Sequence, residues 1–348
     1  MRFSPLTLRK FRRFRSIKRG YYSFILLGLM LLISCLGELF VNDRALIVKY
    51  DGEYFFPTYG KILTGKDFGL NYDYEVNYLA LKRLFAKESG DNWLLMPLVP
   101  FSPFESHFRP GVYPPTPPSL EEQHYLGTDT SGRDILARLF YGFRIVMFGA
   151  FIYLIFTYLI GIIIGCAMGY AGGKFDILMQ RFIEIWSNIP FLYMVIIVTS
   201  IIRPNIGILL AIIVLFSWTS MTYYMRTATY KEKSRDYIAA ARTLGASNGR
   251  IIFRHILPNI LSTLVTFIPF SVAAAITALT ALDFLGFGLP PPTPSWGELL
   301  RQGTSHLSAP WIVTSTFIAL VSVLTLVTFI GEAIREAFDP KQYTVYDA

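Results

Sequence analysis

The chain has 348 residues, of which 53% are hydrophobic and only 16% charged, and its mean hydropathy is +0.44. Soluble domains usually carry about 25% charged residues, so this composition excludes an ordinary soluble protein and predicts a membrane protein. The net charge of +8 does not indicate nucleic-acid binding, because many basic residues form one arm directly before an apolar segment.

That arm covers residues 1–20 and holds eight lysines and arginines but no acidic residue. An apolar run over 21–41 follows, and it is long enough to cross a bilayer, which takes about 20 residues. Positive residues are retained on the cytoplasmic side, so we expect an inside N-terminus and an uncleaved first transmembrane helix. The alternative is a cleaved segment, because Leu32-Ile33-Ser34-Cys35 is similar to a lipoprotein cleavage box.

Five further apolar runs follow, and together with the first they predict an all-α polytopic protein with six transmembrane helices. These runs cover residues 145–170, 184–202, 206–225, 258–282 and 310–331. An even number of spans returns the C-terminus to the cytoplasm and places the loop 229–257 inside as well. Basic residues outnumber acidic ones around this loop, which agrees with that orientation.

Residues 42–142 form the largest insertion between spans, and we expect them outside. Aromatic residues among alternating apolar positions predict a folded segment with some strands, and the proline-rich stretch 103–118 predicts extended chain. We therefore divide the chain into an arm 1–20, a first helix 21–41, the insertion 42–142, a transmembrane domain 143–340 with its loop 229–257, and a tail 341–348.

The third span begins among charged residues. Arg181 and Glu184 are three positions apart, a spacing that favours an ion pair on one helix face. A functional role for them and simple snorkelling at the membrane boundary both remain open. Pro190 should bend or break this helix, because proline removes a backbone donor and crowds the preceding turn.

The loop between the fourth and fifth spans predicts two short helices separated at Gly245. We expect Asp236 to cap the first helix, Gly245 to end it, and Ser247 to cap the second. Pro258 fits the first turn of the next span, where its missing amide proton costs nothing.

Small residues dominate the first of these helices, so another chain could approach closely at Ala240 and Ala241, with Arg242 beside them. The two short helices, fixed between two spans, would form a compact knob, and such a knob suits the docking of a partner. The alternative is an amphipathic hairpin that lies on the membrane surface.

The spacing of this loop resembles the segment of binding-protein-dependent ABC importer permeases that inserts into the ATPase subunit. The family pattern is Glu-Ala-Ala, three residues, Gly, nine residues, then Ile-x-Leu-Pro. The matching positions are Ala240, Ala241, Gly245, Leu257 and Pro258. Ala239 replaces the glutamate and His255 replaces the isoleucine, so a salt bridge from that glutamate is not expected here.

Three more blocks resemble the oligopeptide and dipeptide class of these permeases: residues 124–144, 284–297 and 331–340. The first contains Gly127, Asp129, Gly132, Arg133 and Asp134, and the second contains Gly286, Gly288 and Trp296. The charges of the first block suit a turn tied by an ion pair, a structural cap or, less simply, a substrate contact. The second block suits either a re-entrant element at the outer mouth or a tight connection. Residues 46–57 look most like the permease for peptides and the peptide-nucleotide antibiotic microcin C.

The resemblance implies a permease bundle in the bacterial inner membrane, surrounded by lipid, with both termini cytoplasmic and the insertion periplasmic. It implies a homologous second permease, two ATP-binding domains (paired or fused) and a periplasmic peptide-binding protein, with a peptide as the substrate. It implies no cofactor in this chain, since ATP and magnesium belong to the partner ATPase, and no nucleic acid.

Two other functions are weighed against this one. An ion-coupled secondary transporter would carry ionisable groups near the middle of the membrane or broken helices in repeated halves. A membrane-embedded enzyme would need clustered His, Asp or Glu side chains facing a cavity. The later spans are almost free of charge, and the sequence offers no nucleophile–base set, metal cluster or credible phosphate loop. We therefore expect a transport subunit and not an enzyme.

Overall fold

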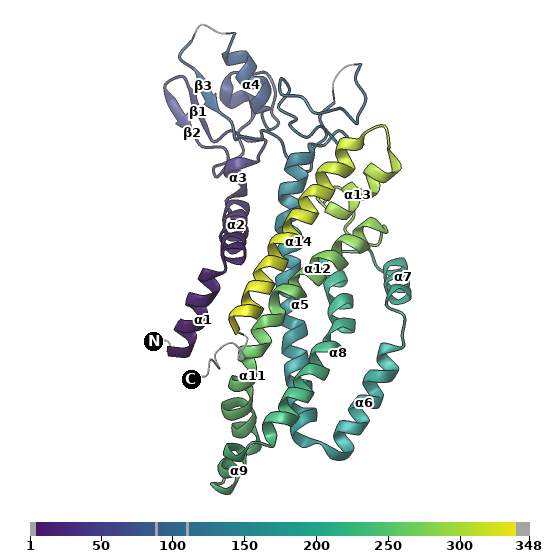
Figure 1. Cartoon of the computed structure of the whole chain (residues 1–348). Coiled ribbons are helices and arrows are strands. Elements are labelled where there is room, and N and C mark those ends of the chain that lie inside the picture. Colours follow the sequence, from purple (N-terminus) through teal and green to yellow (C-terminus); the bar gives the residue numbers. More distant parts are fainter. Residues whose placement is uncertain (1–4, 88–89, 109–110, 339–348) are drawn as a thin grey trace. The chain divides into compact units, whose positions relative to one another are not determined.

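The computed structural model describes residues 5–87, 90–108 and 111–338 and shows a mainly helical chain (Figure 1). The chain divides into two compact units. Unit 1 comprises residues 1–27, 147–282 and 322–348, and unit 2 comprises residues 28–146 and 283–321. The C-terminal motif residues Asp339 and Pro340 and the predicted tail 341–348 lie outside the described residues.

Within the described ranges, five helical stretches are long and apolar enough to cross a membrane. They are α2 (Lys18–Cys35), α5 (Ile135–Ala171), α8 (Ile206–Lys233), the continuous stretch Asn248–Phe284 and α14 (Pro310–Phe338). The count rises to six if α6 (Gly173–Ser187) and α7 (Phe191–Ile201) form one broken span, since they are bent by 67°. This confirms the polytopic helical class and the bend predicted at Pro190.

The predicted pair at the start of the third span also forms. The Arg181 Nη1 and Glu184 Oε2 atoms lie 2.6 Å apart, and both side chains are largely exposed, so the pair contributes little to stability.

Several boundaries differ from those predicted, at the first, second and fourth spans among others. The first long helix starts at Lys18 and stops at Cys35, before a short helix α3 (Gly37–Phe40). Helix α5 starts at Ile135 and not near 145, and α8 continues to Lys233. Charged residues lower the hydropathy of the first and last helical turns. A search for apolar runs therefore misses these turns, although charged residues are compatible with helix. A basic helix α1 (Pro5–Ser16) occupies much of the predicted arm.

In unit 1, α5 and α8 approach each other so closely that only glycine fits on α5. A Cβ added at Gly165 or Gly169 would lie 2.5 Å from the carbonyl oxygen of Thr222 or Arg226. Gly161, one turn earlier, lies equally close to Met221. Small residues four positions apart are a common means of backbone packing between membrane helices.

In unit 2, the insertion contains a three-stranded antiparallel sheet, as its alternating pattern predicts. Its strand order is β2 (Glu53–Phe55), β1 (Ile47–Tyr50), β3 (Trp93–Leu95), with Val48 of β1 opposite Phe55 and Leu94. One face packs on the amphipathic helix α4 (Tyr78–Phe85) and the 3₁₀ turn η1 (Gly65–Phe68). The core of this small domain contains Ala45, Val48, Phe68, Tyr78, Leu81, Phe85 and Leu94.

The remaining elements form the loop after α8 and the stretch before α14. They are α9 (Asp236–Thr243), α10 (Asn248–Arg250), the π-helical η2 (Ile251–Ile256), α11 (Leu257–Leu264), η3 (Val265–Phe267), α12 (Ile268–Phe284) and α13 (Trp296–Ser305).

Candidate functional site

The predicted knob, residues 236–257, belongs to unit 1 and begins with helix α9. Arg235 and not Asp236 occupies the N-cap position, and it makes no side-chain capping bond. The predicted Asp236 cap is therefore wrong, although its carboxylate in the first turn still favours the helix dipole. The helix ends as predicted: Gly245 has φ = +79°. The Ala246 amide donates to the Ala241 carbonyl at 3.0 Å, which satisfies a free end of the helix.

The second half of the knob is not a separate helix. Ser247 caps it by accepting from the Arg250 amide at 3.4 Å, but the helix then continues through α10, η2 and α11 into α12. The wider π-helical turn lies directly before Pro258, where the proline ring would crowd an ordinary α-turn. The Asn259 side chain donates to the His255 carbonyl at 2.8 Å. The span expected to begin at Pro258 thus begins already at Asn248, as one continuous helix.

Buried side chains fix the knob to the spans of unit 1. Ile238, Ile251 and Ile256 are fully buried in one cluster with Met225 and Tyr170. The Tyr170 hydroxyl donates to the Asn248 side-chain oxygen at 2.8 Å. The Arg242 guanidinium lies 5.8 Å from the centre of the same ring, a cation–π distance. The knob is therefore packed directly on α5 and α8.

A polar link ties the two halves of the knob at its base. The Tyr237 hydroxyl donates to Glu232 at 2.6 Å and accepts from the Asn259 side chain at 2.9 Å. These residues come from α9, the end of α8 and α11, so three elements are held together by two hydrogen bonds.

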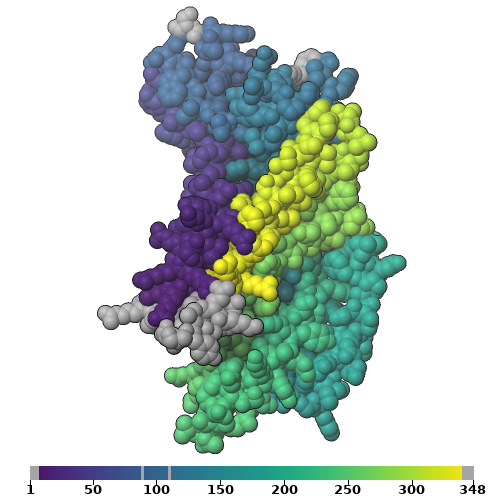
Figure 2. Space-filling view, in the orientation of Figure 1, coloured from purple at the N-terminus to yellow at the C-terminus, as the bar shows by residue number. Residues whose placement is uncertain are grey.

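The outer surface of the knob combines small and apolar side chains. Ala239, Ala240 and Gly245 are exposed, while Leu244 is 87% and Phe253 65% exposed. Figure 2 shows this green part of the chain at the lower surface of the view. The sequence analysis missed Leu244 and Phe253. The signal for Leu244 was an apolar side chain directly before the glycine that ends the helix, a position where no other element covers it.

The other predicted residues lie in unit 2, where four charged side chains form a buried ion-paired cluster: Asp129, Arg133, Arg138 and Glu298. Asp129 organises the turn that contains Gly132, which has φ = +77°. Its Oδ1 atom accepts from the amides of Ser131 (2.8 Å) and Arg133 (3.0 Å), and its Oδ2 atom accepts from Arg133 Nε at 2.8 Å.

Glu298 joins both arginines of the cluster. Arg133 Nη2 lies 3.0 Å from Glu298 Oε1, and Arg138 pairs with the other carboxylate oxygen. Arg138 also donates to the carbonyls of Pro103 (2.9 Å) and Pro292 (3.0 Å). Burial opposes the charge of Arg133, but the Asp129 and Glu298 carboxylates outweigh it and raise the pKa of this guanidinium.

Asp134 has a different role, because it caps helix α5. Its Oδ1 atom accepts from the Ala137 amide at 2.7 Å, and its Oδ2 atom lies 2.8 Å from His124 Nδ1. This is the geometry of a structural helix cap.

The glycine-rich stretch before α13 is tightly folded around Asp283, whose Oδ1 atom accepts from the Leu289 amide at 2.8 Å. Gly286 has φ = +85°, and a Cβ at Gly288 would overlap the Asp283 carboxylate. Trp296 then donates from Nε1 to the Leu139 carbonyl at 2.9 Å. Glycine is required at these turns, and the stretch is tied firmly to α5.

Two tryptophan rings of unit 2 pack closely against glycines. A Cβ at Gly142 would lie 2.7 Å from the Trp296 ring. A Cβ at Gly127, which has φ = +77°, would lie 2.9 Å from the Trp311 ring, whose Nε1 donates to the Thr128 carbonyl.

The predicted residues thus lie in the knob of unit 1 and in the loops of unit 2, where only Asp129 and Arg133 of the predicted set belong to the ion-paired cluster. The cluster includes Arg138 and Glu298, which the sequence analysis did not select. Across residues 5–87, 90–108 and 111–338, no group of three or more His, Cys, Asp or Glu side chains could hold a metal ion.

Comparison with known proteins gives this architecture a family. Residues 161–342 match the model of the family described as "Binding-protein-dependent transport system inner membrane component". The inner membrane ABC transporter permease protein YejE of Escherichia coli is 42% identical, covering 98% of this chain and 99% of that protein. The peptidoglycan transport system permease protein YejE of Agrobacterium fabrum is 37% identical, covering 98% and 94%. The oligopeptide transport system permease protein OppC of Haemophilus influenzae is 36% identical, covering 64% and 72%.

Proposed function

The chain belongs to the family of binding-protein-dependent transport system inner membrane components, and we propose that it is the permease subunit of an ATP-driven importer of peptides. It is a multi-pass inner-membrane protein and a transport subunit, not an enzyme. The relatives named for oligopeptide and peptidoglycan transport support a peptide-type substrate. Peptide conjugates such as microcin C are a narrower proposal within that class, supported by the resemblance of residues 46–57.

The proposed assembly contains a homologous second permease, two ATP-binding domains (paired or fused) and a periplasmic peptide-binding protein. ATP and magnesium bind to the ATP-binding domains and not to this chain. In the proposed orientation both termini and the knob are cytoplasmic, and the small domain of the insertion is periplasmic. The family supports partners of these three kinds in general.

The observation that carries the proposal is the form of the knob. Its outer surface presents Ala240, Gly245 and the exposed Leu244, while its inner surface is locked into the core of α5 and α8. A partner that grips the outside therefore moves the spans. Closure of the ATP-binding domains would shift this permease between inward- and outward-facing states, because ATP binds the two states with different affinity.

The test is peptide uptake by the complete transporter in proteoliposomes. We expect accumulation only when ATP and the ATP-binding subunits are present. Accumulation driven by an ion gradient in their absence would contradict the proposal and favour the secondary transporter.

A matched pair of glycine variants tests the knob itself. Gly245 and Gly249 are both exposed and a Cβ would meet nothing at either, but only Gly245 has positive φ. Gly245→Val should strain the helix end by about 1–3 kcal/mol and lower the peptide transported per ATP hydrolysed, whereas Gly249→Val should transport normally. Equal coupling in the two variants would argue against the knob as the transmitting element.

A further inference from the structure

An apolar pocket of about 490 Å³ lies within unit 1, where the basic helix α1 meets the first span. Its walls come from α1, α2, α11 with the start of η3, and α14, and the helices are labelled in Figure 1. The pocket has the size of a ligand site, since such sites usually measure about 300–1,000 Å³. Most of its lining is aromatic or aliphatic, and the main contributors are Phe11, Phe14, Tyr21, Phe24, Leu261 and Ile334.

Direct contacts hold the walls of this apolar pocket together. The rings of Phe14 and Phe24 meet edge to face, with their centres 5.9 Å apart. A Cβ added at Gly20 would overlap the Ala333 side chain, so α2 packs tightly on α14. Since α1 and α2 are tied to each other and α2 to α14, the hollow is a property of packed elements and not of one loose helix.

Two cations are placed at the edge of the apolar pocket by rings that line it. Lys10 Nζ lies 4.5 Å from the centre of the Phe338 ring, and the Arg15 guanidinium lies 5.7 Å from the centre of the Tyr21 ring. Both are cation–π distances. Neither Lys10 nor Arg15 forms an ion pair within residues 5–87, 90–108 and 111–338, so both charges are available to an anion.

The surroundings of these two cations are also basic. Arg9, Arg12 and Lys18 are exposed on the same arm, which contains no acidic residue. On α14, Glu332 is taken by Arg19, with Arg19 Nη2 and Glu332 Oε2 3.2 Å apart. A group of lysines and arginines directly beside a membrane span is typical of a surface that attracts anionic lipid.

The apolar pocket is continuous with a surface that faces hydrocarbon. Phe24 lines it and is also 56% exposed, and Ile25, Leu26 and Leu29 of the same helix are exposed as well. Helix α2 is long and apolar enough to cross a membrane, so these side chains meet acyl chains and not water. A ligand with a hydrocarbon tail can therefore enter from within the bilayer, while its polar end stays at the level of the arm.

We propose that this apolar pocket binds an anionic phospholipid, with an acyl chain between the rings and the phosphate beside Lys10 and Arg15. Arginine binds phosphate through paired N–H donors, and lysine binds it as a point charge. The two cations, which lack acidic partners in the described chain, favour a lipid with net negative charge over a zwitterionic one. Binding of this lipid does not depend on the proposed function, but its place in the cytoplasmic leaflet rests on the proposed orientation.

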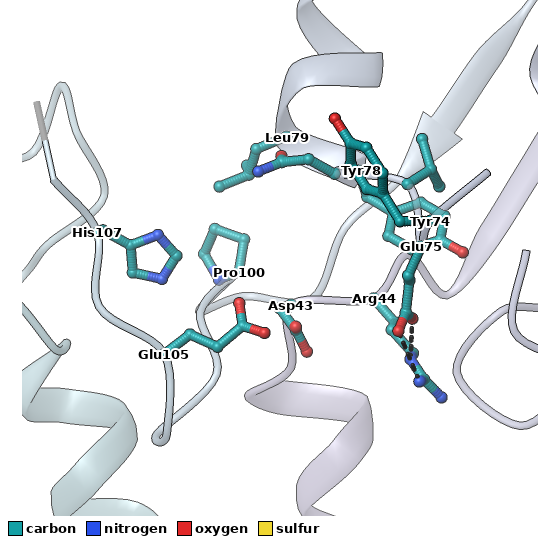
Figure 3. Close-up of a pocket in the computed structure, with 11 residues that line it drawn as sticks. Asp43, Arg44, Tyr74, Glu75, Tyr78, Leu79, Pro100, Glu105 and His107 are labelled. Atoms are coloured by element: carbon teal, nitrogen blue, oxygen red, sulfur yellow. Dashed lines mark hydrogen bonds and ion pairs between the residues drawn. The ribbon is translucent and has the colours of Figure 1, made fainter. Parts of the chain in front are cut away.

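A second pocket, in the small domain of unit 2, shows the opposite chemistry. The pocket drawn in Figure 3 is lined by three carboxylates, those of Asp43, Glu75 and Glu105. Its Arg44 is already paired with Glu75, since Arg44 Nε and Glu75 Oε1 lie 2.6 Å apart. Such a lining repels a phosphate group, so the anionic lipid is expected at the apolar pocket of unit 1.

The experiment is native mass spectrometry of the full-length chain, purified in a mild detergent and titrated with dioleoyl-phosphatidylglycerol or with dioleoyl-phosphatidylcholine. The two lipids have the same acyl chains and differ in net charge. We expect phosphatidylglycerol to be retained about tenfold or more tightly, because its charge is not balanced within the head group. Glycerol phosphate in excess should not displace it, because a free phosphate ester has no chain for the apolar pocket.

The two cations are tested by a charge-matched pair of double variants. Lys10→Ala with Arg15→Ala should weaken binding of phosphatidylglycerol about tenfold or more and leave phosphatidylcholine unchanged. Lys174→Ala with Lys231→Ala removes two charges at exposed positions of unit 1 that do not line the apolar pocket. This control should bind both lipids normally.

The acyl-chain site is tested by a second pair of variants. Ser262 lines the apolar pocket and donates to the Asn259 carbonyl at 3.2 Å. Ser200 makes the same kind of contact with Ile197 at 2.7 Å but lies exposed on α7, away from the lining. Ser262→Trp should weaken phosphatidylglycerol binding about threefold or more, because the ring takes the place of buried methylene groups, whereas Ser200→Trp should not.

Equal retention of the two lipids, or an unchanged preference in the Lys10 and Arg15 variant, would overturn the proposal. Displacement by glycerol phosphate would also overturn it, since the site would then be one for a free anion. The same holds if the full-length chain binds no phosphatidylglycerol because residues 339–348 or another protein cover the apolar pocket. All of these titrations are read without transport, so their failure is distinct from a failure of peptide uptake.

Discussion

At the scale of single residues, the least ordinary feature is the almost complete burial of Arg138 together with Glu298 and Asp129. Removing charges from water is costly, and a buried pair is tolerated only when the remaining hydrogen-bonding groups are satisfied. Here the carbonyls of Pro103 and Pro292 accept hydrogen bonds from Arg138, while its buried Nε atom lies 3.4 Å from Asp129 Oδ2 without a hydrogen bond. The cluster therefore ties the loop before α5 and the loop before α13 to the first turn of α5.

Neutralising one partner should destabilise unit 2. We expect Glu298→Gln to lower the free energy of unfolding by about 3–5 kcal/mol, because Asp129 alone must then balance the buried charges of Arg133 and Arg138. Glu121→Gln, at an exposed carboxylate of the same unit, is the matched control and should change stability little. Thermal unfolding of the purified protein, followed by tryptophan fluorescence, measures both. Similar midpoints for the two variants would show that the cluster is not needed for stability.

This cluster also shows which contacts can be predicted from the sequence and which cannot. The turn of Asp129 and Arg133 was predictable, because the two residues lie four positions apart among glycines. The pairing of Arg138 with Glu298 joins residues 160 positions apart in the chain. The local sequence around either residue does not indicate the other.

At the scale of elements, the contact of α5 with α8 depends on three glycines one turn apart. Without an aqueous hydrophobic effect between membrane helices, close backbone packing supplies much of the attraction. The sequence contains this glycine repeat at 161, 165 and 169, but hydropathy alone does not reveal it. Because the knob is anchored on the same two helices, this contact also sets how firmly the knob is held.

A single methyl group at this contact should be enough to disturb it. We expect Gly165→Ala to cost about 1–3 kcal/mol, since its Cβ would overlap the Thr222 carbonyl and overpacking carries this penalty. Gly28→Ala places the same methyl group on α2, where it meets nothing within 4 Å. This control should be neutral or slightly stabilising, because alanine favours helix over glycine. Unfolding of both variants in the same detergent decides whether the glycine repeat matters.

The helical elements themselves were largely predictable, because each apolar run is long enough to span a bilayer. The errors fall where local chemistry overrides hydropathy. Asp134 starts α5 early by capping it, and the π-helical turn before Pro258 joins the second helix of the knob to the span that was expected to begin at this proline. Both features depend on backbone hydrogen bonds that composition does not encode.

At the scale of the whole molecule, the chain combines a membrane unit that carries the knob with a second unit that carries the small domain and the charge cluster. Relatives of nearly the same length share this extent of sequence. We propose that force from a partner enters at the knob. Exposure of Leu244 on an otherwise firmly packed knob is the feature that most needs a partner.

The most direct test of this account is crosslinking from the knob in intact inner membranes. The two native cysteines, Cys35 and Cys166, are first replaced by alanine, and single cysteines are then introduced by Leu244→Cys and, as the control, by Tyr113→Cys at an equally exposed position of the insertion. The account predicts that a short bifunctional reagent captures the ATP-binding subunit from position 244 and not from position 113, with a yield that changes when ATP is added. Capture from neither position, or equal capture from both, would contradict it.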